Sequence, residues 1–295
     1  MGFIIQRPII KVVDASDFHV IALTNKAFDI VVKRELMREW SLVFTVLNSD
    51  GISNSLGMGI FLFENEIYNM VLENVNIGTE NTTTVKCEHM SYSLNKWSVQ
   101  SNFTATGTIT QIFNAAFSAS GIPFSWQYYF DNYANELNFT FTYTGSQPIS
   151  LRALLYKIAA QRYFEINFSY TTTARTIICK EQIGNKTNSG DKLTPALFTL
   201  GRNLLSANLQ SDYSQNPIAE SYNFDIVNLQ RTDSYISTDV FDLGLEVDYH
   251  SNGIDQSGLR ITTYEYHYDD PLQDKIGIGS FIPDLSDSKT TGGGI

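Results

Sequence analysis

Two amphipathic helices are predicted near the middle of the chain, because apolar residues recur there at intervals of three and four. The apolar face of the first helix, over residues 108–121, consists of Ile109, Ile112, Phe113, Ala116 and Phe117. Thr108 can cap its amino end, and Gly121 can adopt the left-handed conformation that ends a helix. The apolar face of the second helix consists of Leu151, Leu154, Leu155, Ile158 and Ala159. Ser150 occupies its cap position, and Arg162 lies in its last turn, where a cation complements the helix dipole.

Each helix is followed by two strand patterns. Their ranges are 124–130 and 137–143 after the first helix, and 165–170 and 176–180 after the second. The first two strands form a pair that flanks a turn region at Asp131-Asn132. Because the order helix, strand, strand occurs twice, the two helices can lie on one small sheet. We therefore expect a compact α/β subdomain over residues 101–185.

Alternating polar and apolar residues dominate the chain on both sides of this subdomain, which is typical of half-buried strands. Before it, the strand patterns are 9–13, 19–23, 28–34, 42–47, 59–63, 66–76 and 82–92. After it, they are 224–229, 235–240, 243–249, 258–269 and 276–282. Between the subdomain and these strands, residues 195–209 are expected to begin with a strand, and 209–221 is polar and turn-rich. Short strands at this spacing predict a β-barrel or sandwich over residues 1–100.

Composition and charge narrow the class of protein. Hydrophobic residues make up 43% of the 295 positions, which is enough for proper cores, whereas only 17% are charged. The net charge of −11 argues against tight binding of nucleic acid, although an acidic wall could let DNA slide past it. No apolar run approaches the roughly 20 residues that span a bilayer, and we expect neither a secretory signal nor a membrane-spanning segment.

The two cysteines, Cys87 and Cys179, both lie in strand patterns, and we expect buried free thiols rather than a disulfide. Five Asn-x-Ser/Thr sequons occur, at Asn81, Asn102, Asn138, Asn167 and Asn185. Since no secretory signal is expected, we attribute the sequons to the Asn- and Thr-rich composition. Both features fit synthesis in a reducing cytoplasm.

Candidate metal ligands alternate along two predicted strands. One trio is Glu246, Asp248 and His250, and the other is Glu265, His267 and Asp269. Either trio could hold a divalent cation, but a solvated strand face explains them better. The face opposite the second trio carries Tyr264, Tyr266 and Tyr268. Aromatic residues at this period favour barrel cores or subunit interfaces over a carbohydrate-stacking surface.

The motifs of common enzymes are missing from the sequence. It contains no His-Glu-x-x-His, Cys-x-x-Cys or Gly-x-Ser-x-Gly. The glycine pairs at 57/59 and 277/279 lack the third glycine and the following helix of a nucleotide-binding loop, so we interpret them as strand-end glycines. Sequence alone selects no carboxylate pair for glycoside hydrolysis. We assign no catalytic, cofactor-binding or metal-binding residue and expect no cofactor.

Several stretches in order resemble one known family. They are Glu35-Leu with Leu42-Val-Phe-Thr-Val46, Glu66-Ile-Tyr-Asn-Met-Val71, Val85-Lys-Cys-Glu-His-Met-Ser-Tyr-Ser-Leu94, Leu151-Arg-Ala-Leu-Leu155 with Phe164-Glu-Ile-Asn-Phe168, Gly201-Arg-Asn-Leu204 and Leu259-Arg-Ile-Thr-Thr-Tyr264. Together they resemble the tail hub region of long-tailed bacteriophages, also called the tail-associated lysin or prophage tail endopeptidase family. The resemblance covers residues 5–285.

This resemblance implies a baseplate-hub-like fold that is mainly β with an α+β insert. It would comprise a first tube-like β-barrel over 1–100, the α/β subdomain over 101–185, a second β-barrel over 186–285 and a flexible tail or linker over 286–295. Three copies would then form a homotrimer of six barrels beneath a hexameric distal tail protein. Many members continue into a fibre-like or peptidoglycan-degrading region, whereas this sequence stops at Ile295.

The resemblance implies a structural, non-enzymatic protein of the virion tail tip, or baseplate, made in the bacterial host cytoplasm. The trimer would close or continue the tail tube and open for DNA ejection. Its partners would be the distal tail protein, the tape-measure protein inside and receptor-binding proteins outside, with DNA passing without specific binding. Two alternatives remain open: a tail-associated peptidoglycan hydrolase or endopeptidase, and a carbohydrate-binding protein of the host surface.

Overall fold

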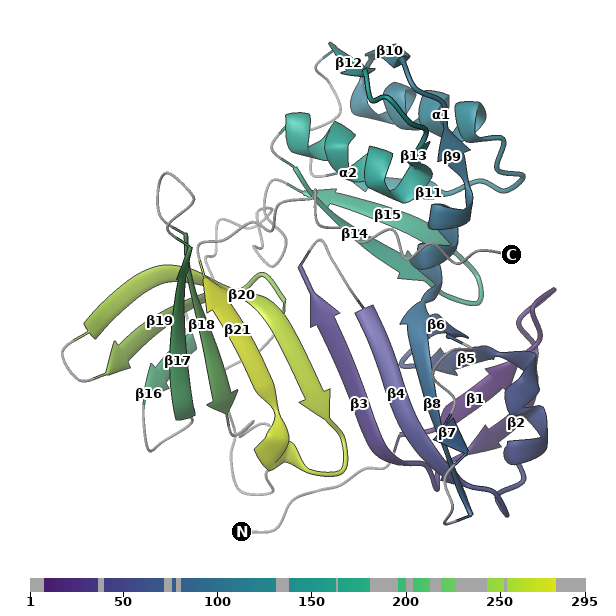
Figure 1. Ribbon diagram of the computed structural model, residues 1–295, viewed down its shortest axis with the longest axis vertical. Coiled ribbons are helices and arrows are strands. Elements are labelled where there is room, and N and C mark those ends of the chain that lie inside the picture. Colours follow the sequence, from purple (N-terminus) through teal and green to yellow (C-terminus); the bar gives the residue numbers. More distant parts are fainter. Residues whose placement is uncertain are drawn as a thin grey trace. The chain divides into compact units, whose positions relative to one another are not determined.

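The computed structural model has a mainly β architecture with two helices in an inserted module (Figure 1), which confirms the predicted fold class. The structure describes residues 8–36, 40–71, 76–77, 81–130, 138–162, 164–180, 196–199, 204–212, 219–226, 243–251 and 254–279. Its contacts divide the chain into two units. The first unit contains the strands before residue 90 and after residue 184, together with Tyr170–Thr173, and the second unit contains the helices.

The strands of the first unit fall into two groups along the chain. The first strand group consists of β1 (Ile10–Val13), β2 (Val20–Thr24), β3 (Phe28–Glu35), β4 (Trp40–Leu47), β5 (Ile60–Phe63), β6 (Glu66–Met70), β7 (Asn76–Ile77) and β8 (Thr82–His89). The second strand group consists of β16 (Ala196–Thr199), β17 (Leu204–Asp212), β18 (Ala219–Ile226), β19 (Glu246–Ser251), β20 (Ile254–His267) and β21 (Lys275–Gly279). Short 3-10 helices lie at Ser53–Met58 and Pro271–Gln273.

One continuous sheet joins the two groups. Its order is β17-β18-β21-β20-β3-β4-β8-β6-β5-β1-β2, and the junction is the antiparallel pair of β20 with β3. Because side chains alternate across a pleated sheet, neighbouring rows of residues face opposite ways. The row Tyr266, Val32, Leu42 and Cys87 packs in or against an apolar core, whereas the adjacent row carries charged and polar side chains.

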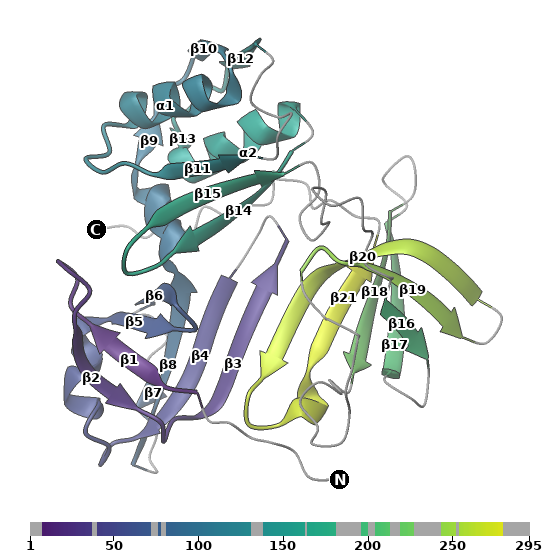
Figure 2. The same cartoon turned by 180° about the vertical axis from the view of Figure 1, so that it is seen from behind.

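The first strand group curls around its own apolar cluster. The cluster includes Val12, Ile30, Phe44, Phe61 and Val85, all at most 1% exposed. The rings of Phe44 in β4 and Phe61 in β5 meet edge-on at 5.2 Å, although β8 and β6 separate these strands in the sheet order. The sheet must therefore fold back on itself, and the strands change direction progressively from β3 to β5 (Figure 2).

The second strand group has a separate apolar cluster, which includes Val247, Leu259, Ile261, Ile276 and Ile278. The tyrosine row of β20 links the two clusters. Tyr264 belongs to the second cluster, Tyr268 packs against the first, and Tyr266 contacts both. The ring centroids of consecutive tyrosines in this row are 5.4 and 4.6 Å apart. Tyr264 is buried, whereas Tyr266 and Tyr268 are partly buried and pack against the clusters. The expectation that these tyrosines belong to barrel cores or subunit interfaces stays a prediction, as does the division into two barrel domains.

Both predicted helices form in the second unit. α1 (Ile109–Ser120) begins with a capping box, in which the Thr108 hydroxyl accepts a bond from the Gln111 amide and the Gln111 side chain accepts one from the Thr108 amide. It ends at Gly121, whose φ of 71° is left-handed. α2 (Leu151–Gln161) begins at Ser150, which caps the Ala153 amide. The predicted apolar faces are buried, and α1 packs against α2.

The strands of this unit pair differently from the prediction. β11 (Gln127–Phe130) pairs in parallel with β15 (Arg175–Lys180), and β14 (Glu165–Tyr170) is the neighbour of β15 on its other side. β12 (Phe139–Tyr143) pairs with β10 (Phe103–Gly107), and β13 (Ile149–Ser150) pairs with β9 (Ser98–Val99). The prediction of one small sheet, with 124–130 and 137–143 as a strand pair, is therefore wrong. The apolar face predicted for 137–143 is more buried than its polar face at Phe139, Phe141 and Tyr143, but the distant β10 and β15 supply the partners of the two strands.

Other differences are local. The stretch 209–221, predicted as turns, contains the end of β17 and the start of β18, which pair along their length from Leu204 to Asp212. Its polar side chains misled the prediction, because paired backbone amides hold a strand regardless of side-chain polarity. The predicted strand at 235–240, the connector at 183–194 and the tail at 286–295 lie outside the described residues.

Candidate functional site

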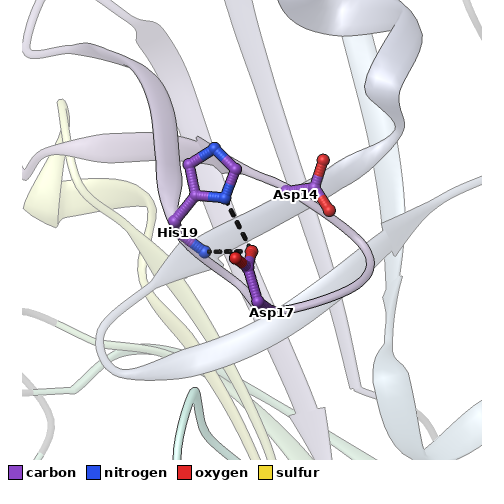
Figure 3. A group of neighbouring side chains, drawn as sticks. All are labelled: Asp14, Asp17 and His19. Carbon is purple, nitrogen blue, oxygen red and sulfur yellow. Dashed lines mark hydrogen bonds and ion pairs between the residues drawn. The ribbon is translucent and has the colours of Figure 1, made fainter.

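A cluster of possible metal ligands occupies the turn between β1 and β2. In the described part of the chain, Asp14, Asp17 and His19 are the only acid, histidine or cysteine group whose ligand atoms all lie within 4.8 Å of one another (Figure 3). Our sequence analysis missed this group. Its signal is the compact spacing Asp-x-x-Asp-x-His within six residues.

Local hydrogen bonds account for the geometry of this turn. The Asp17 carboxylate accepts bonds from the His19 Nδ1 at 2.6 Å and from the His19 amide at 3.1 Å, and Asp14 accepts one from the Ser16 amide at 2.7 Å. The hydrogen bond from His19 lowers the pKa of Asp17, the bonds from Ser16 lower that of Asp14, and the bond to Asp17 raises the pKa of His19. Side-chain exposure of 61% for His19 and 64% for Asp17 marks a solvated turn, so we assign it no metal.

The predicted trio at the end of β20 separates into two interactions. Glu265 and His267 lie on one face, with the His267 Nε2 2.8 Å from the Glu265 carboxylate, and Lys275 Nζ lies 3.3 Å from the same oxygen. Asp269 instead accepts a hydrogen bond from the Ile30 amide at 3.1 Å. The third predicted ligand is thus engaged with the start of β3. The side chains of the other trio, Glu246, Asp248 and His250, lie outside the described residues.

The carboxyl group of Glu265 has a pKa well below its ordinary value. Its pKa is lowered to about 2, chiefly by the hydrogen bond with His267 and then by the charge of Lys275, against the opposing effect of desolvation. On the side of β20 opposite β21, the strand register places Lys33 of β3 directly across from Glu265. The carboxylate therefore lies between cations on both neighbouring strands, at the junction of the two strand groups.

A polar row crosses the junction on the face away from the apolar clusters. Cross-strand pairing aligns, in order, Lys275, Glu265, Lys33, Ser41 and Glu88. Their charges alternate in sign along the first three positions, and Lys33 also pairs with Glu35 at 2.6 Å. Mixed charge at this density forms a hydrated surface without a strong potential of either sign. This row is a candidate interaction surface rather than a catalytic arrangement.

A buried polar pair lies inside the first strand group. The His89 ring is 1% exposed, with its Nε2 3.1 Å from the Glu66 carboxylate, and it lies between the rings of Trp40 and Tyr68 at 5.2 and 5.7 Å. Burial is the main reason that the pKa of Tyr68 rises to about 12. No signal in the sequence distinguishes this histidine from a surface one, because its strand pattern alone does not identify its ring contacts.

A buried arginine in the second unit contacts three aromatic rings. Arg152 is 7% exposed, and its guanidinium lies 4.0 Å from the centre of the Tyr92 ring, 5.0 Å from that of Tyr156 and 5.5 Å from that of Phe168. It also donates to the Tyr156 hydroxyl at 3.1 Å. Arginine suits such a cage because its flat cation stacks on aromatic faces. The arrangement is enclosed by the protein's own side chains and serves packing.

The two cysteines are buried free thiols, as predicted. Burial raises the pKa of both Cys87 and Cys179, which keeps them protonated and unreactive at neutral pH. Among the helices that the structure describes, none is long and apolar enough to cross a membrane.

Comparison with known proteins identifies the fold. No protein-family model matches the chain, and no curated protein matches it in sequence. A prophage tail protein from Listeria monocytogenes is 11% identical, with a TM-score of 0.63 over 95% of this chain and 96% of that chain. The tail protein of prophage MuSo2 from Shewanella oneidensis is 12% identical, with a TM-score of 0.58 over 95% of this chain and 100% of that chain.

A third solved structure agrees with these two. A tail protein from Neisseria meningitidis is 9% identical, with a TM-score of 0.54 over 92% of this chain and 95% of that chain. At such low identities the likeness is one of fold. The chain therefore has the fold of phage tail proteins along nearly its whole length, as the resemblance in sequence implied.

Proposed function

We propose that this chain is a structural protein of the tail tip, the baseplate hub, of a long-tailed phage or phage-like particle. The observation that carries the proposal is the shared fold, which spans almost the entire length of this chain and of three phage tail proteins. Nearly complete coverage of both chains favours a common role over a borrowed module. The described side-chain clusters fit this role, since each is explained by packing or by a local turn.

The working form in this proposal is a homotrimer that closes or continues the tail tube and opens for DNA ejection. Each chain has two strand groups with separate apolar clusters, joined through β3 and β20. Three copies would present six similar groups, which matches the symmetry of a hexameric distal tail protein. The tape-measure protein and receptor-binding proteins are the other partners in the proposal, and the site of action is the virion tail tip.

The polar row across the junction is the proposed wall of the passage. It lies on the sheet face opposite the apolar clusters, and its alternating Lys275, Glu265 and Lys33 would neither hold nor strongly repel a polyanion. This refines the expectation of a uniformly acidic path, because the −11 net charge of the chain need not lie along that face. DNA would pass without specific binding.

Mass measurement in solution tests the oligomeric state. We expect light scattering to give three times the 33.2 kDa chain mass, either alone or after addition of the distal tail protein from the same particle. A chain that stays monomeric under both conditions would contradict the hub assignment. Zymography on purified cell walls tests the absence of catalysis, and a cleared zone produced by this chain would replace the structural role with a hydrolase.

A further inference from the structure

Along one line of the first strand group, between the β5–β6 turn and β3, no described strand pairing joins the two sides. Among the described strands, β3 pairs with β20 and β4, while β5 pairs with β1 and β6, so no ladder joins the turn between β5 and β6 to β3. The group nevertheless curls far enough to bring the Phe63 ring, at the end of β5, to 5.2 Å from the ring of Tyr268 beyond β20. Among the described residues, side-chain contacts hold this line together.

Glu64 makes two polar contacts across the line. Glu64 accepts a hydrogen bond from the Tyr268 hydroxyl through one carboxylate oxygen, and Arg34 Nη2 of β3 lies 3.3 Å from the other. Burial and then the charge of Glu64 raise the pKa of Tyr268, so this hydroxyl remains a donor. The Tyr268 amide in turn donates to the Ile30 carbonyl at 2.9 Å, which connects the contact to β3.

Backbone conformation shows that Glu64 is an unusual choice for this turn. Glu64 and Asn65 form the two-residue turn with φ values of 48° and 68°, both left-handed. Such turns favour glycine or asparagine, and a long side chain at the first position is disfavoured. Asn65 follows this preference and Glu64 does not. The side-chain contacts of Glu64 offset its backbone conformation, which points to a role for the carboxylate.

We propose that the Glu64 side chain is a releasable clasp, which holds the β5–β6 turn against Tyr268 and Arg34 and closes the first strand group where the sheet leaves it open. Release of the clasp separates the turn from β3 while the ladder from β3 through β4, β8, β6 and β5 stays paired. The tyrosine row carries this movement to the second strand group, because Tyr266 contacts both apolar clusters. The clasp belongs to the single chain and does not depend on the proposed trimer.

Two glycine substitutions in the same turn test the clasp. Glu64→Gly removes the carboxylate and relieves the left-handed backbone, whereas Asn65→Gly relieves the neighbouring backbone and leaves the clasp in place. Hydrogen exchange followed by mass spectrometry or NMR reports on the Ile30 and Tyr268 amides. We expect Glu64→Gly to speed their exchange roughly tenfold, and Asn65→Gly to leave it unchanged or slower. Amides of the β4–β8 ladder should stay protected in both variants.

Tyr268→Phe tests the clasp from the other side, because it removes only the hydroxyl and keeps the ring against Phe63. It should speed the same amides to a similar degree, and combining it with Glu64→Gly should add little. Equal exchange in the Glu64→Gly and Asn65→Gly chains would overturn the proposal, as would fully additive effects or equal loss of protection in the β4–β8 ladder. If Glu64→Gly fails to fold, Tyr268→Phe decides alone, since normal exchange at Ile30 would then reject the clasp.

Discussion

The His89 Nε2 lies 3.1 Å from the Glu66 carboxylate inside the first strand group, where only 1% of the His89 side chain is exposed. A buried ion or hydrogen-bond pair is sensitive to removal of either member, since the remaining group stays desolvated. The His89 ring also packs against the rings of Trp40 and Tyr68. His89 therefore stabilises the first strand group both through its hydrogen bond with Glu66 and through packing of its ring.

We predict that His89→Ala lowers the free energy of unfolding by about 2–4 kcal/mol, because it leaves a cavity and removes one of the hydrogen bonds to the Glu66 carboxylate, which also accepts one from the Tyr170 amide. Urea denaturation followed by tryptophan fluorescence measures the change. Lys86→Ala is the control, since Lys86 lies on the same strand with an exposed side chain. A loss for His89→Ala no larger than that for Lys86→Ala would show that the pair is not structural.

Glu265 predicts an acid-dependent loss of stability. Its pKa in the folded chain is about 2, below the ordinary value of 4.5, so its ionised form stabilises the folded state above pH 4.5. This contribution is lost as the pH falls from about 4.5 through 2. Glu265→Gln should therefore flatten the pH dependence of the urea midpoint in that window. Parallel curves for the wild-type and Glu265→Gln chains would contradict the assignment.

Arg152→Lys should be destabilising despite the retained charge. The lysine ammonium cannot stack flat against Tyr92 and Tyr156 or reproduce the fork of donors, and we expect a loss of about 1–3 kcal/mol. Thermal unfolding of the helical unit by far-UV circular dichroism measures it. Arg162→Lys is the matched control, because the Arg162 guanidinium stacks over one described ring, that of Phe139, instead of over three. Equal shifts for both variants would remove the special role of the cage.

The capping box of α1 gives a smaller, local prediction. Thr108→Ala removes the acceptor for the Gln111 amide and should cost about 1 kcal/mol. Ser118→Ala, at an exposed position within the same helix, should instead be neutral or slightly stabilising. Denaturation midpoints of the two variants should move in opposite directions or differ clearly, and a shared shift would argue against the cap.

The two thiols should resist labelling in the folded chain. Cys87 is 2% exposed and Cys179 is fully buried, and burial raises the pKa of each. At pH 8, a disulfide reagent should therefore react with neither thiol within minutes. After the chain is unfolded in guanidinium at roughly 6 M, the reagent should react with both thiols. Rapid reaction of the native chain would show that one of the strands β8 or β15 opens readily.

Local signals in the sequence determined the helices and most strand positions. Caps at Thr108 and Ser150, the glycine at 121 and the period of the apolar residues act within a few residues of where they occur, so they can be recognised without a structure. The same is true of the period-2 row that buries Tyr264 and packs Tyr266 against both apolar clusters. These patterns were sufficient for a mainly β chain with an inserted helical module.

Tertiary structure decided which strands meet. β11 pairs with β15 rather than with its neighbour β12, and β20 joins β3 across more than 200 residues, because long-range pairing depends on which apolar faces can be buried together and not on local sequence. The same reason hid the contacts of His89 and Glu64, and those of Arg152 with Tyr92 and Phe168, because these partners come from distant strands or elements. The sequence alone thus determined the elements and the faces they bury, and only the folded sheet brought Glu64 to Tyr268.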